Sequence, residues 1–449
     1  MASSPSSERR LLGAVGAVQR EEWPFALLMF TYVFLVIGTF WILKPLKKGL
    51  FIEHYDASGF MLLGRHFEAA EAELFAKVVN MLVAIVAVAI FTWLARRFRR
   101  DRLTAILMGF FIAADLAYAQ LLAAPGPATV WSFYLFGDLF STLMVATFFA
   151  FLNDSVTPEA AKRLYGFVGL GAVLGGVVGS SLLGALIGSL RAPTWLYACA
   201  AAGVVVVVVA VAAGRLVQPG VVAAAPASTE TPRHNPAIEG AALVLRSPYL
   251  LSIAAIVGLY EIVSTVMDFQ FTSSVAHFLN GDAIATHLSR VFAVTNIASM
   301  LVQFFLTPIV MQTWGLGIAL LILPATTGAG SLAFLALPSL WIGSLLNTAD
   351  NAFSYSINQS AKEALYVPTS EDEKYKAKAF IDMFVQRAAK AVAVGLSLAM
   401  GWWFHDFSSV RWLSLVTLAL VAVWVMAARR AGRGYPGATR TEHPGRRAA

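Results

Sequence analysis

Long apolar runs follow one another along most of the chain, with short polar segments between them. A hydrocarbon core about 30 Å thick needs about 20 apolar residues in a helix. Runs of about this length lie at 24–43, 74–94, 103–124, 130–153, 165–190, 193–214, 249–272, 290–311, 315–336, 339–359, 378–402 and 411–428. The pattern therefore predicts an all-α membrane protein with about twelve transmembrane helices.

One long polar segment divides these spans into two groups of six. Residues 215–248 are rich in Pro, Ala, Ser and Thr, a composition typical of a flexible linker. We therefore predict a cytoplasmic segment 1–23, a six-helix bundle 24–214, a cytoplasmic linker 215–248, a second six-helix bundle 249–428 and a basic, disordered tail 429–449. Similar inner loops follow the fourth and tenth spans. Two parallel six-helix halves are typical of the major-facilitator architecture, whose substrate binds near the midplane between the halves.

Lysine and arginine are distributed unevenly between the two sides of the predicted membrane. If both termini are cytoplasmic, the inner segments hold 23 of the 33 Lys and Arg residues and the outer segments hold seven. Positive charge favours the cytoplasmic side, so we predict a multi-pass protein with both termini in the cytoplasm, in a bacterial inner membrane. Topology explains the net charge of +7 better than nucleic-acid binding does.

Composition agrees with the membrane interpretation and argues against several other classes. Hydrophobic residues make up 58% of the chain and charged residues 13%, and the mean hydropathy is +0.70. The single cysteine, Cys199, forms no internal disulfide, and the histidines are scattered along the chain. The sequence contains no GxSxG, HExxH or paired-Cys motif. We therefore predict no enzyme activity, no metal site and no cofactor.

Ionisable residues inside the spans are the candidates for function, because burying a charge in a bilayer is costly. The alternative for each of them is a structural pair that only fixes helix packing. Besides the residues of span eleven, the candidates for a central cavity are Asp115, Asp138, Glu261, Asp268, Asp350 and, in the following inner loop, Lys362.

Span eleven combines the most polar residues on one side of a helix. At 100° per residue, Asp382, Gln386 and Lys390 form a row spaced by four, and Arg387 lies about 60° beyond Lys390. A polar face inside a bundle indicates a water-filled cavity, and two cations suit a substrate that carries phosphate or carboxylate. The alternative is that Asp382 and the cations only neutralise one another.

The end of the first span carries Lys44-Pro45-Leu46-Lys47-Lys48. We expect the proline to end the helix, Lys44 to face the cavity, and Lys47 and Lys48 to reach the membrane interface. Span five is rich in glycine but lacks a following Lys-Ser/Thr, so it indicates close helix packing rather than a phosphate loop.

Two segments resemble the bacterial and plastid ATP/ADP translocase family, nucleotide transporters related to the major-facilitator superfamily. The stronger match runs from Tyr355 to Asp382 and contains the elements Lys-Glu, Tyr-x-Pro, Lys-x-Lys and Ile-Asp; the weaker match runs from Asn153 to Gly171. The resemblance covers about 20–430.

The resemblance implies exchange of adenine nucleotides by alternating access, with ATP and ADP as the anionic substrates, and by analogy it pairs Asp268 with Lys44 in the cavity. With the polar face of span eleven, the predicted substrate-binding residues are Lys44, Asp268, Asp382, Gln386, Arg387 and Lys390. The chain departs from the family pattern at Thr272, where the family has Lys, at Lys47-Lys48, and at Gln359-Ser360-Ala361. These departures leave a related organic anion open as cargo. The alternatives are another amphiphilic anion or a lipid, or a membrane scaffold or sensor that transports nothing.

Overall fold

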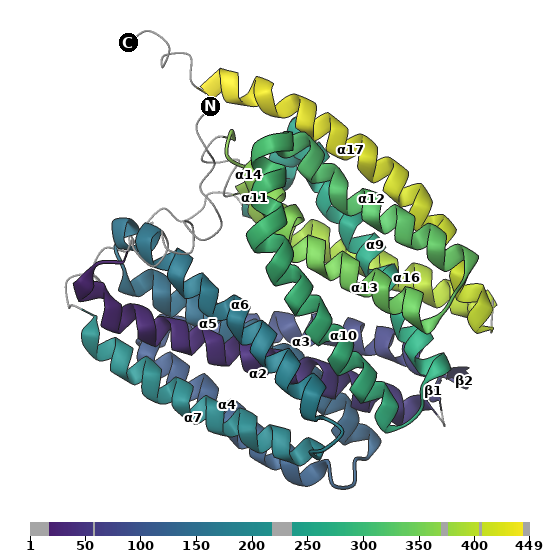
Figure 1. The fold of residues 1–449 in the computed structure, drawn as a ribbon, viewed down its shortest axis with the longest axis horizontal. Helices are drawn as coiled ribbons and strands as arrows, with labels where there is room; N and C mark the ends of the chain where they lie inside the picture. Colours follow the sequence, from purple (N-terminus) through teal and green to yellow (C-terminus); the bar gives the residue numbers. More distant parts are fainter. Residues whose placement is uncertain (1–17, 57–58, 218–235, 370–375, 404–405, 443–449) are drawn as a thin grey trace. The chain divides into compact units, whose positions relative to one another are not determined.

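The structure is a computed structural model that describes residues 18–56, 59–217, 236–369, 376–403 and 406–442. The chain divides into two compact units. Unit 1 comprises 1–227 and 280–296, and unit 2 comprises 228–279 and 297–449. The segment 280–296 therefore belongs with the first half of the chain in space, a feature that the hydrophobic pattern does not indicate. Figure 1 labels the elements of both units.

The described residues of unit 1 form helices and one short hairpin. Its elements are η1 (Arg20–Glu22), α2 (Trp23–Asp56), the antiparallel strands β1 (Phe60–Leu62) and β2 (Arg65–Phe67), α3 (Ala69–Arg97), α4 (Arg100–Leu121), α5 (Pro127–Ser155), α6 (Pro158–Leu186), α7 (Ala192–Leu216) and the first part of α10 (Asp282–Leu301). Helix α2 packs against α6, α5 and α7, and α4 packs against α7 and α5.

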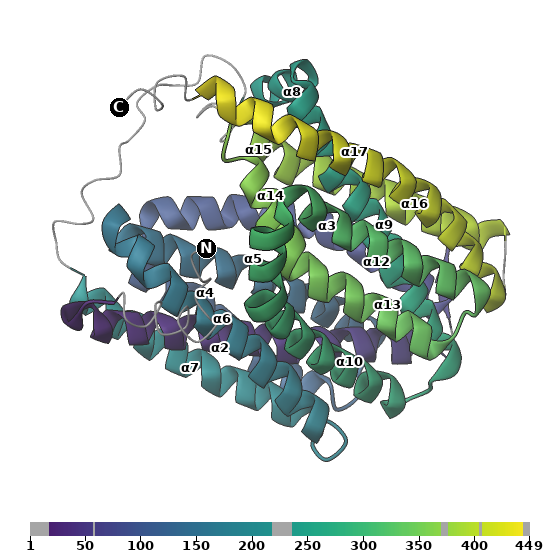
Figure 2. The ribbon, with the colours of Figure 1, turned by 45° about the horizontal axis from the view of Figure 1, so that its top comes forward.

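Glycines allow α2 and α6 to approach closely. A Cβ atom at Gly171 would lie 2.7 Å from the backbone oxygen of Phe30, and Cβ atoms at Gly175 and Gly179 would overlap the backbone of α2. These three glycines are spaced by four, so they form one strip on α6, as small residues do in tightly packed membrane helices. The predicted packing role of the glycines in span five is confirmed for these three, whereas a Cβ atom at Gly169 or Gly188 would meet no neighbour. Figure 2 shows the two helices side by side.

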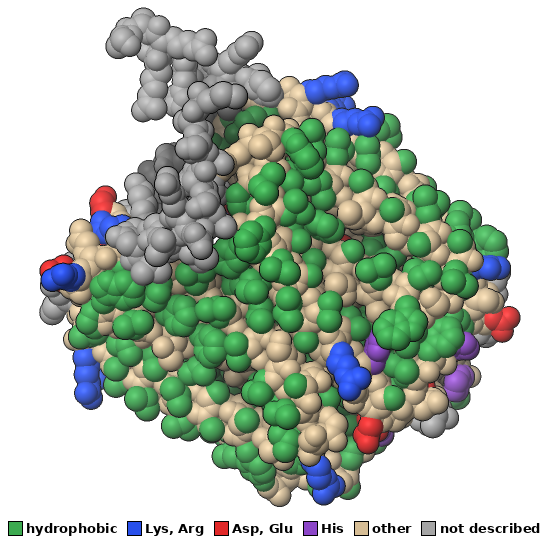
Figure 3. Space-filling view, viewed as in Figure 1, with side chains coloured by type: hydrophobic (Ala, Val, Ile, Leu, Met, Phe, Trp, Pro, Cys, Tyr) green, Lys and Arg blue, Asp and Glu red, His purple; other side chains and the backbone are tan. Residues whose placement is uncertain are grey.

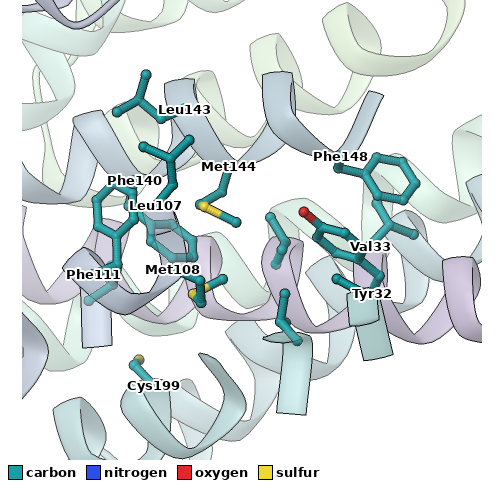
Figure 4. Close-up of a cluster of buried hydrophobic side chains, with 14 of the residues drawn as sticks. Tyr32, Val33, Leu107, Met108, Phe111, Phe140, Leu143, Met144, Phe148 and Cys199 are labelled. Carbon is teal, nitrogen blue, oxygen red and sulfur yellow. The ribbon is translucent and has the colours of Figure 1, made fainter. Parts of the chain in front are cut away.

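A large apolar core fills the interior of unit 1 (Figure 4). The rings of Tyr32 and Phe148 pack edge to face with centroids 5.2 Å apart, and the Tyr32 hydroxyl shares a 3.0 Å hydrogen bond with Thr104. Cys199 is buried within this core, which agrees with a packing role for the thiol.

Helix α2 continues past Pro45, so the prediction that this proline ends the first span is wrong. The helix runs on to Asp56 and buries Leu46, Phe51 and Ile52. A proline inside a helix removes one backbone hydrogen bond. The apolar contacts made by the following turns outweigh this loss.

The other helices among the described residues belong to unit 2. They are α8 (Pro236–Arg246), α9 (Pro248–Phe278), the end of α10, η2 (Val302–Leu306), α11 (Thr307–Ile309), η3 (Val310–Trp314), α12 (Gly315–Ala336), α13 (Leu340–Phe353), η4 (Ser354–Asn358), α14 (Gln359–Leu365), α15 (Lys378–Phe380), η6 (Ile381–Val385), α16 (Gln386–Trp403), η7 (Phe407–Trp412) and α17 (Leu413–Glu442). The segments η2, η3, η4 and η6 are π-helical. Helix α9 packs against α13, α16 and α17, and α12 packs against α13 and α17.

Ten helical stretches among the described residues are long and apolar enough to cross a membrane. One of them, Asp282–Ala336, has 55 residues, far more than one span needs. It contains two of the predicted spans. Gly315 between them has φ +77°, a conformation that glycine adopts readily and that turns the chain. The predicted tenth span corresponds to α13, η4 and α14. The helix count therefore agrees with about twelve spans.

Hydrophobic side chains dominate the outer surface, as expected for a protein whose solvent is lipid. Figure 3 shows a face covered largely by apolar side chains, with few charged groups. Large apolar residues such as Leu82, Trp93 and Val208 are about 60% exposed. A soluble monomer rarely exposes apolar surface on this scale.

Candidate functional site

A cluster of charged residues is buried within unit 1. We call Lys47, Lys48, Lys77, Glu73 and Asp138 the lysine cluster. Lys47 forms an ion pair with Asp138. Glu73 forms two ion pairs, one on each carboxylate oxygen: Lys48 Nζ lies 3.4 Å from Oε1, and Lys77 Nζ lies 3.3 Å from Oε2. Lys47 and Lys48 are each 5% exposed, and Glu73 is 1% exposed. The expectation that Lys47 and Lys48 reach the membrane interface is wrong, because the helix that carries them continues and holds both inside the bundle.

Three helices supply the lysine cluster. Lys47 and Lys48 lie on α2, Glu73 and Lys77 lie one turn apart on α3, and Asp138 lies on α5. Tyr134, one turn before Asp138, donates a 2.9 Å hydrogen bond from its hydroxyl to Glu73. The face of its ring lies 4.1 Å from Lys47 Nζ, a favourable cation–π distance. A Cβ atom at Gly137 would lie 2.7 Å from the Lys47 side chain, so glycine makes room for the buried lysine stem.

Lys44 lies one turn before the lysine cluster on α2, among aromatic rings. Its Nζ is 4.5 Å from the ring centroid of Trp41, 4.9 Å from that of Phe292 and 5.7 Å from that of Phe40. The rings of Trp41 and Phe292 contact each other edge to face, with centroids 5.9 Å apart. Phe292 belongs to the part of α10 that groups with unit 1. These rings hold an ammonium group in a pocket of aromatic faces.

In unit 2, two of the predicted residues of span eleven meet a carboxylate on α9. Gln386 donates a 3.2 Å hydrogen bond to Glu261, and Lys390 Nζ lies 3.8 Å from the other oxygen of the same carboxylate. Arg387, beside them on α16, forms no hydrogen bond or ion pair with the residues that the structure describes. The guanidinium is therefore available to an anion.

Asp382 has different charged neighbours from Gln386 and Lys390. It lies in the π-helical segment η6, whereas Gln386 begins the α-helix that follows. The charges that attract Asp382 are Lys362 and Lys378. Of the predicted candidates, Asp382 and Lys362 therefore form a separate group.

Asp268 and Asp350 both lie between α9 and α13. The side-chain amide of Asn347 donates a long, 3.5 Å hydrogen bond to Asp268. The hydroxyl of Ser264 donates a 2.7 Å hydrogen bond to Asp350. Both partners are neutral. These contacts form a polar seam along the interface between two helices of unit 2.

Asp115 is separate from the lysine cluster. It is 2% exposed and lies on α4, where it interacts electrostatically with Cys199 on α7. One of its carboxylate oxygens has no hydrogen-bond partner among the described residues. The structure thus places Asp138 in a charged cluster and Asp115 in an apolar helix interface, although the sequence marks both as acids inside a span.

Sequence reasoning missed Glu73 and Tyr134. Glu73 falls one residue before the predicted run 74–94 and was assigned to a loop. The signal for it was present in the spacing, because Glu73 and Lys77 are four residues apart and face the same side of a helix. The tyrosine carried no signal, since an aromatic residue is ordinary within an apolar span.

Comparison with known proteins first defines the class. The fold is shared with a solved membrane protein: the crystal structure of a mutant of the nucleoside transporter NupG superposes with a TM-score of 0.61 over 91% of this chain and 99% of that chain, at 12% identity. This likeness concerns the fold. The predicted fold class is confirmed.

The family follows from the sequence. The model of the TLC ATP/ADP transporter family matches residues 128–339 and 336–435, which together make up more than half of the chain, and the chain therefore belongs to this family. The suspected resemblance is confirmed. Members of this family are transporters rather than enzymes, and the chain is a multi-pass integral membrane protein.

Curated relatives are distant. ADP,ATP carrier protein 2 of Chlamydia trachomatis is 27% identical over 224 residues, covering 44% of this chain and 41% of the relative. The chloroplastic ADP,ATP carrier protein 1 of Arabidopsis thaliana is 24% identical over 345 residues, covering 67% of this chain and 54% of the relative. The chain spans about half the length of these curated relatives.

Proposed function

We propose that the protein exchanges adenine nucleotides, ATP against ADP, or a related organic anion, by alternating access. Membership of the TLC ATP/ADP transporter family and the transporter fold support this proposal. The observation that carries it is the lysine cluster, because the bilayer is the most costly place for a protein to keep charged groups.

The lysine cluster has the chemistry that a phosphate chain requires. A polyanionic nucleotide loses water when it enters a low-dielectric site, and fixed ammonium groups replace that hydration. Lys47 and Lys48 are held rigidly by their buried stems and by carboxylate partners. An entering phosphate then competes with Glu73 and Asp138 for the same cations, so binding and release need only small side-chain movements.

The aromatic pocket around Lys44 suits the other half of a nucleotide. Aromatic side chains present faces on which a base stacks, and this interaction tolerates any base. The ring centroids of Trp41 and Phe292 lie within 5 Å of the Lys44 ammonium. The rings would stack on the base, and the ammonium group beside them would bind a phosphate. We assign Lys44 to substrate binding on this ground.

In unit 2, we assign substrate binding to Gln386, Arg387 and Lys390. Lys390 and Gln386 share Glu261 as a partner, and Arg387 presents a planar fork of donors that matches phosphate geometry. Asp268 and Asp382 remain proposed binding residues, and Asp115, Asp138, Glu261, Asp350 and Lys362 remain proposed cavity residues. The halves 24–214 and 249–428 are the proposed moving bodies.

The proposed setting is the inner membrane of a bacterium, with both termini in the cytoplasm. The support for this orientation is the excess of Lys and Arg in the predicted inner segments. The basic residues after Arg429 would then face the anionic lipid of the cytoplasmic leaflet.

Counterflow into proteoliposomes tests the function. Vesicles loaded with ATP should take up labelled ADP, and vesicles without internal nucleotide should not. Lys44→Gln should weaken the apparent affinity for ADP by about tenfold to a hundredfold, the loss expected for one charge-assisted contact. Arg65→Gln is the matched control, because Arg65 is an exposed cation of unit 1 on strand β2, and it should behave as wild type.

Other results would replace the proposal. Uptake of labelled phosphate, of another organic anion or of a fluorescent lipid, without uptake of ADP, would assign a different cargo. If none of these moves while an ADP,ATP carrier reconstituted in parallel is active, the protein is a scaffold or sensor rather than a transporter.

A further inference from the structure

Arginines gather at one end of unit 1, where α3 ends, α4 begins and α7 ends. Arg96 and Arg97 lie in the last turn of α3, Arg102 lies in the first turn of α4, and Arg215 lies in the last turn of α7. All four residues are exposed. We call them the arginine patch.

The three helices bring the arginine patch together from distant parts of the sequence. Helices α4 and α7 lie side by side (Figure 1). A Cβ atom at Gly214 on α7 would lie 3.0 Å from the Cβ atom of Asp101 on α4, and the next residue on each helix is an arginine of the patch. Only two residues separate α3 from α4, so the arginines that close α3 lie at the same end of the unit.

The positive charge of the patch is not neutralised by the described residues. The side chains of its four arginines form no hydrogen bond or ion pair with any residue that the structure describes. The carboxylates nearby in the sequence have other partners. Arg100 Nε lies 2.6 Å from Asp154, and Arg99 Nε lies 3.4 Å from Asp101. The guanidinium groups of the patch therefore remain available to an anion.

An exposed apolar strip leads to the patch on each helix. On α3, Trp93 precedes the two arginines by three and four residues and is 60% exposed. On α4, Ile106 and Phe110 follow the arginine by four and eight residues, and Phe110 is 56% exposed. On α7, Val208 precedes the arginine by seven residues and is 62% exposed. Residues at these spacings share one face of a helix.

This combination of apolar strips and arginines fits an amphiphile with a negatively charged head. A guanidinium group donates two parallel hydrogen bonds to a phosphate, and clusters of basic residues next to a span attract anionic lipid headgroups. Hydrocarbon chains would cover the apolar strips. A zwitterionic lipid suits the patch less well, because its own ammonium group is repelled by the arginines.

We propose that the arginine patch binds the phosphodiester headgroup of an anionic phospholipid, whose acyl chains lie along the exposed strips of α3, α4 and α7. The proposal adds a second ligand to the protein and does not depend on the cargo, because the patch contains no residue assigned above to substrate binding. Trp93 then lies beside the acyl chains of the bound lipid, where its fluorescence reports on them.

Quenching of Trp93 by brominated lipid tests the proposal on the full-length protein in phosphatidylcholine vesicles. Dibrominated phosphatidylglycerol and dibrominated phosphatidylcholine are compared at equal mole fractions. Each protein is measured with and without Trp93→Phe, because the chain has 11 tryptophans and the difference isolates the signal of Trp93. We expect the anionic lipid to associate at least about fivefold more strongly than the zwitterionic one.

A triple variant removes one arginine from each helix: Arg97→Gln, Arg102→Gln and Arg215→Gln. Its preference for the anionic lipid should fall to about twofold or less. The matched control replaces three exposed arginines of unit 1 in the predicted outer segments, namely Arg65→Gln, Arg191→Gln and Arg290→Gln, and should keep the wild-type preference.

Salt gives a second measurement that needs no variant. Raising the ionic strength from about 0.1 M to about 1 M shortens the Debye length from about 10 Å to about 3 Å, so the preference of the wild-type protein should weaken. If the triple variant does not fold, as judged by size exclusion, the wild-type preference and its salt dependence still decide the question.

Four results would overturn the proposal. Equal quenching of Trp93 by the two lipids would leave the arginines with a role in topology alone. Unchanged preference in the triple variant would remove the patch from the site, and an equal loss in the control variant would assign the preference to the general charge of the protein. Displacement of the brominated lipid by soluble glycerol phosphate would assign the patch to a free phosphate compound.

Discussion

Asp138→Asn separates the structural role of the lysine cluster from its role in binding. The substitution leaves Lys47 buried with its charge and without its ion-pair partner. Removing one partner of a fully buried pair costs about 3–5 kcal/mol. The Asp138 side chain is 26% exposed, and Lys47 keeps the attraction of Glu73 and the face of Tyr134. We therefore expect a loss at the low end of that range, about 3 kcal/mol.

The comparison variant removes both charges. Lys47→Met with Asp138→Leu replaces the pair by apolar side chains of similar size, a change that is often neutral or stabilising for a buried pair. We expect its unfolding free energy to lie within about 1 kcal/mol of wild type. The double variant should lose affinity for ADP, whereas Asp138→Asn should bind ADP at least as tightly as wild type, because the ammonium group remains and a competing carboxylate is gone.

Unfolding in mixed detergent micelles gives the free energies, and binding of labelled ADP to the folded fraction gives the affinities. Equal destabilisation by the single and double variants would refute the reasoning, since the cost would then come from packing and not from an unpaired charge. Unchanged ADP affinity in the double variant would remove Lys47 from the binding site.

Three further predictions concern helix packing, phosphate binding and topology. Gly175→Ala should destabilise the protein by about 1–3 kcal/mol, because the added methyl group overlaps the backbone of α2. Gly169→Ala on the same helix meets no neighbour and should be neutral or stabilising in the same unfolding assay. Equal effects of the two substitutions would contradict the close packing of α6 against α2. Arg387→Lys should weaken ADP binding nearly as much as Arg387→Ala, about tenfold or more, because both lose the bidentate fork, and unchanged affinity in both would exclude a phosphate contact. On a Cys199→Ser background, Asn280→Cys in the exposed turn after α9 should react with a membrane-impermeant thiol reagent from outside the cell, and labelling from the inside alone would reverse the proposed topology.

The sequence predicted the fold well, because the signal for a membrane helix is local. Twenty consecutive apolar residues specify a span regardless of what packs against it. The boundaries failed where tertiary contacts decide them. Pro45 should have ended α2 on local grounds, but buried residues beyond it keep the helix intact. The glycines of α6 were interpreted correctly because small residues in a span have few other uses.

The candidate sites were predictable as single residues and not as groups. Every ionisable residue inside a span stood out, but sequence does not show which of them meet. Asp115 and Asp138 carried the same signal and have unlike surroundings. Asp382 and Gln386 are four residues apart and were expected to act together, but Asp382 is attracted by Lys362 and Lys378 whereas Gln386 donates to Glu261. No local pattern indicated these partners.

The lysine cluster also has a consequence for how the protein is made. Lys47 is synthesised 91 residues before Asp138, which at about 5–20 residues per second corresponds to roughly 5–18 s on the ribosome. Glu73 leaves the ribosome earlier, with α3. A lysine costs up to about 2.5–3.5 kcal/mol on insertion, the value at the centre of a spanning helix, and Lys47 lies beyond the centre of α2. The apolar stretch before Lys44 must keep α2 in the membrane until α5 arrives. Substitutions that make this stretch more polar should therefore reduce insertion of the nascent chain, even where the assembled protein would tolerate them.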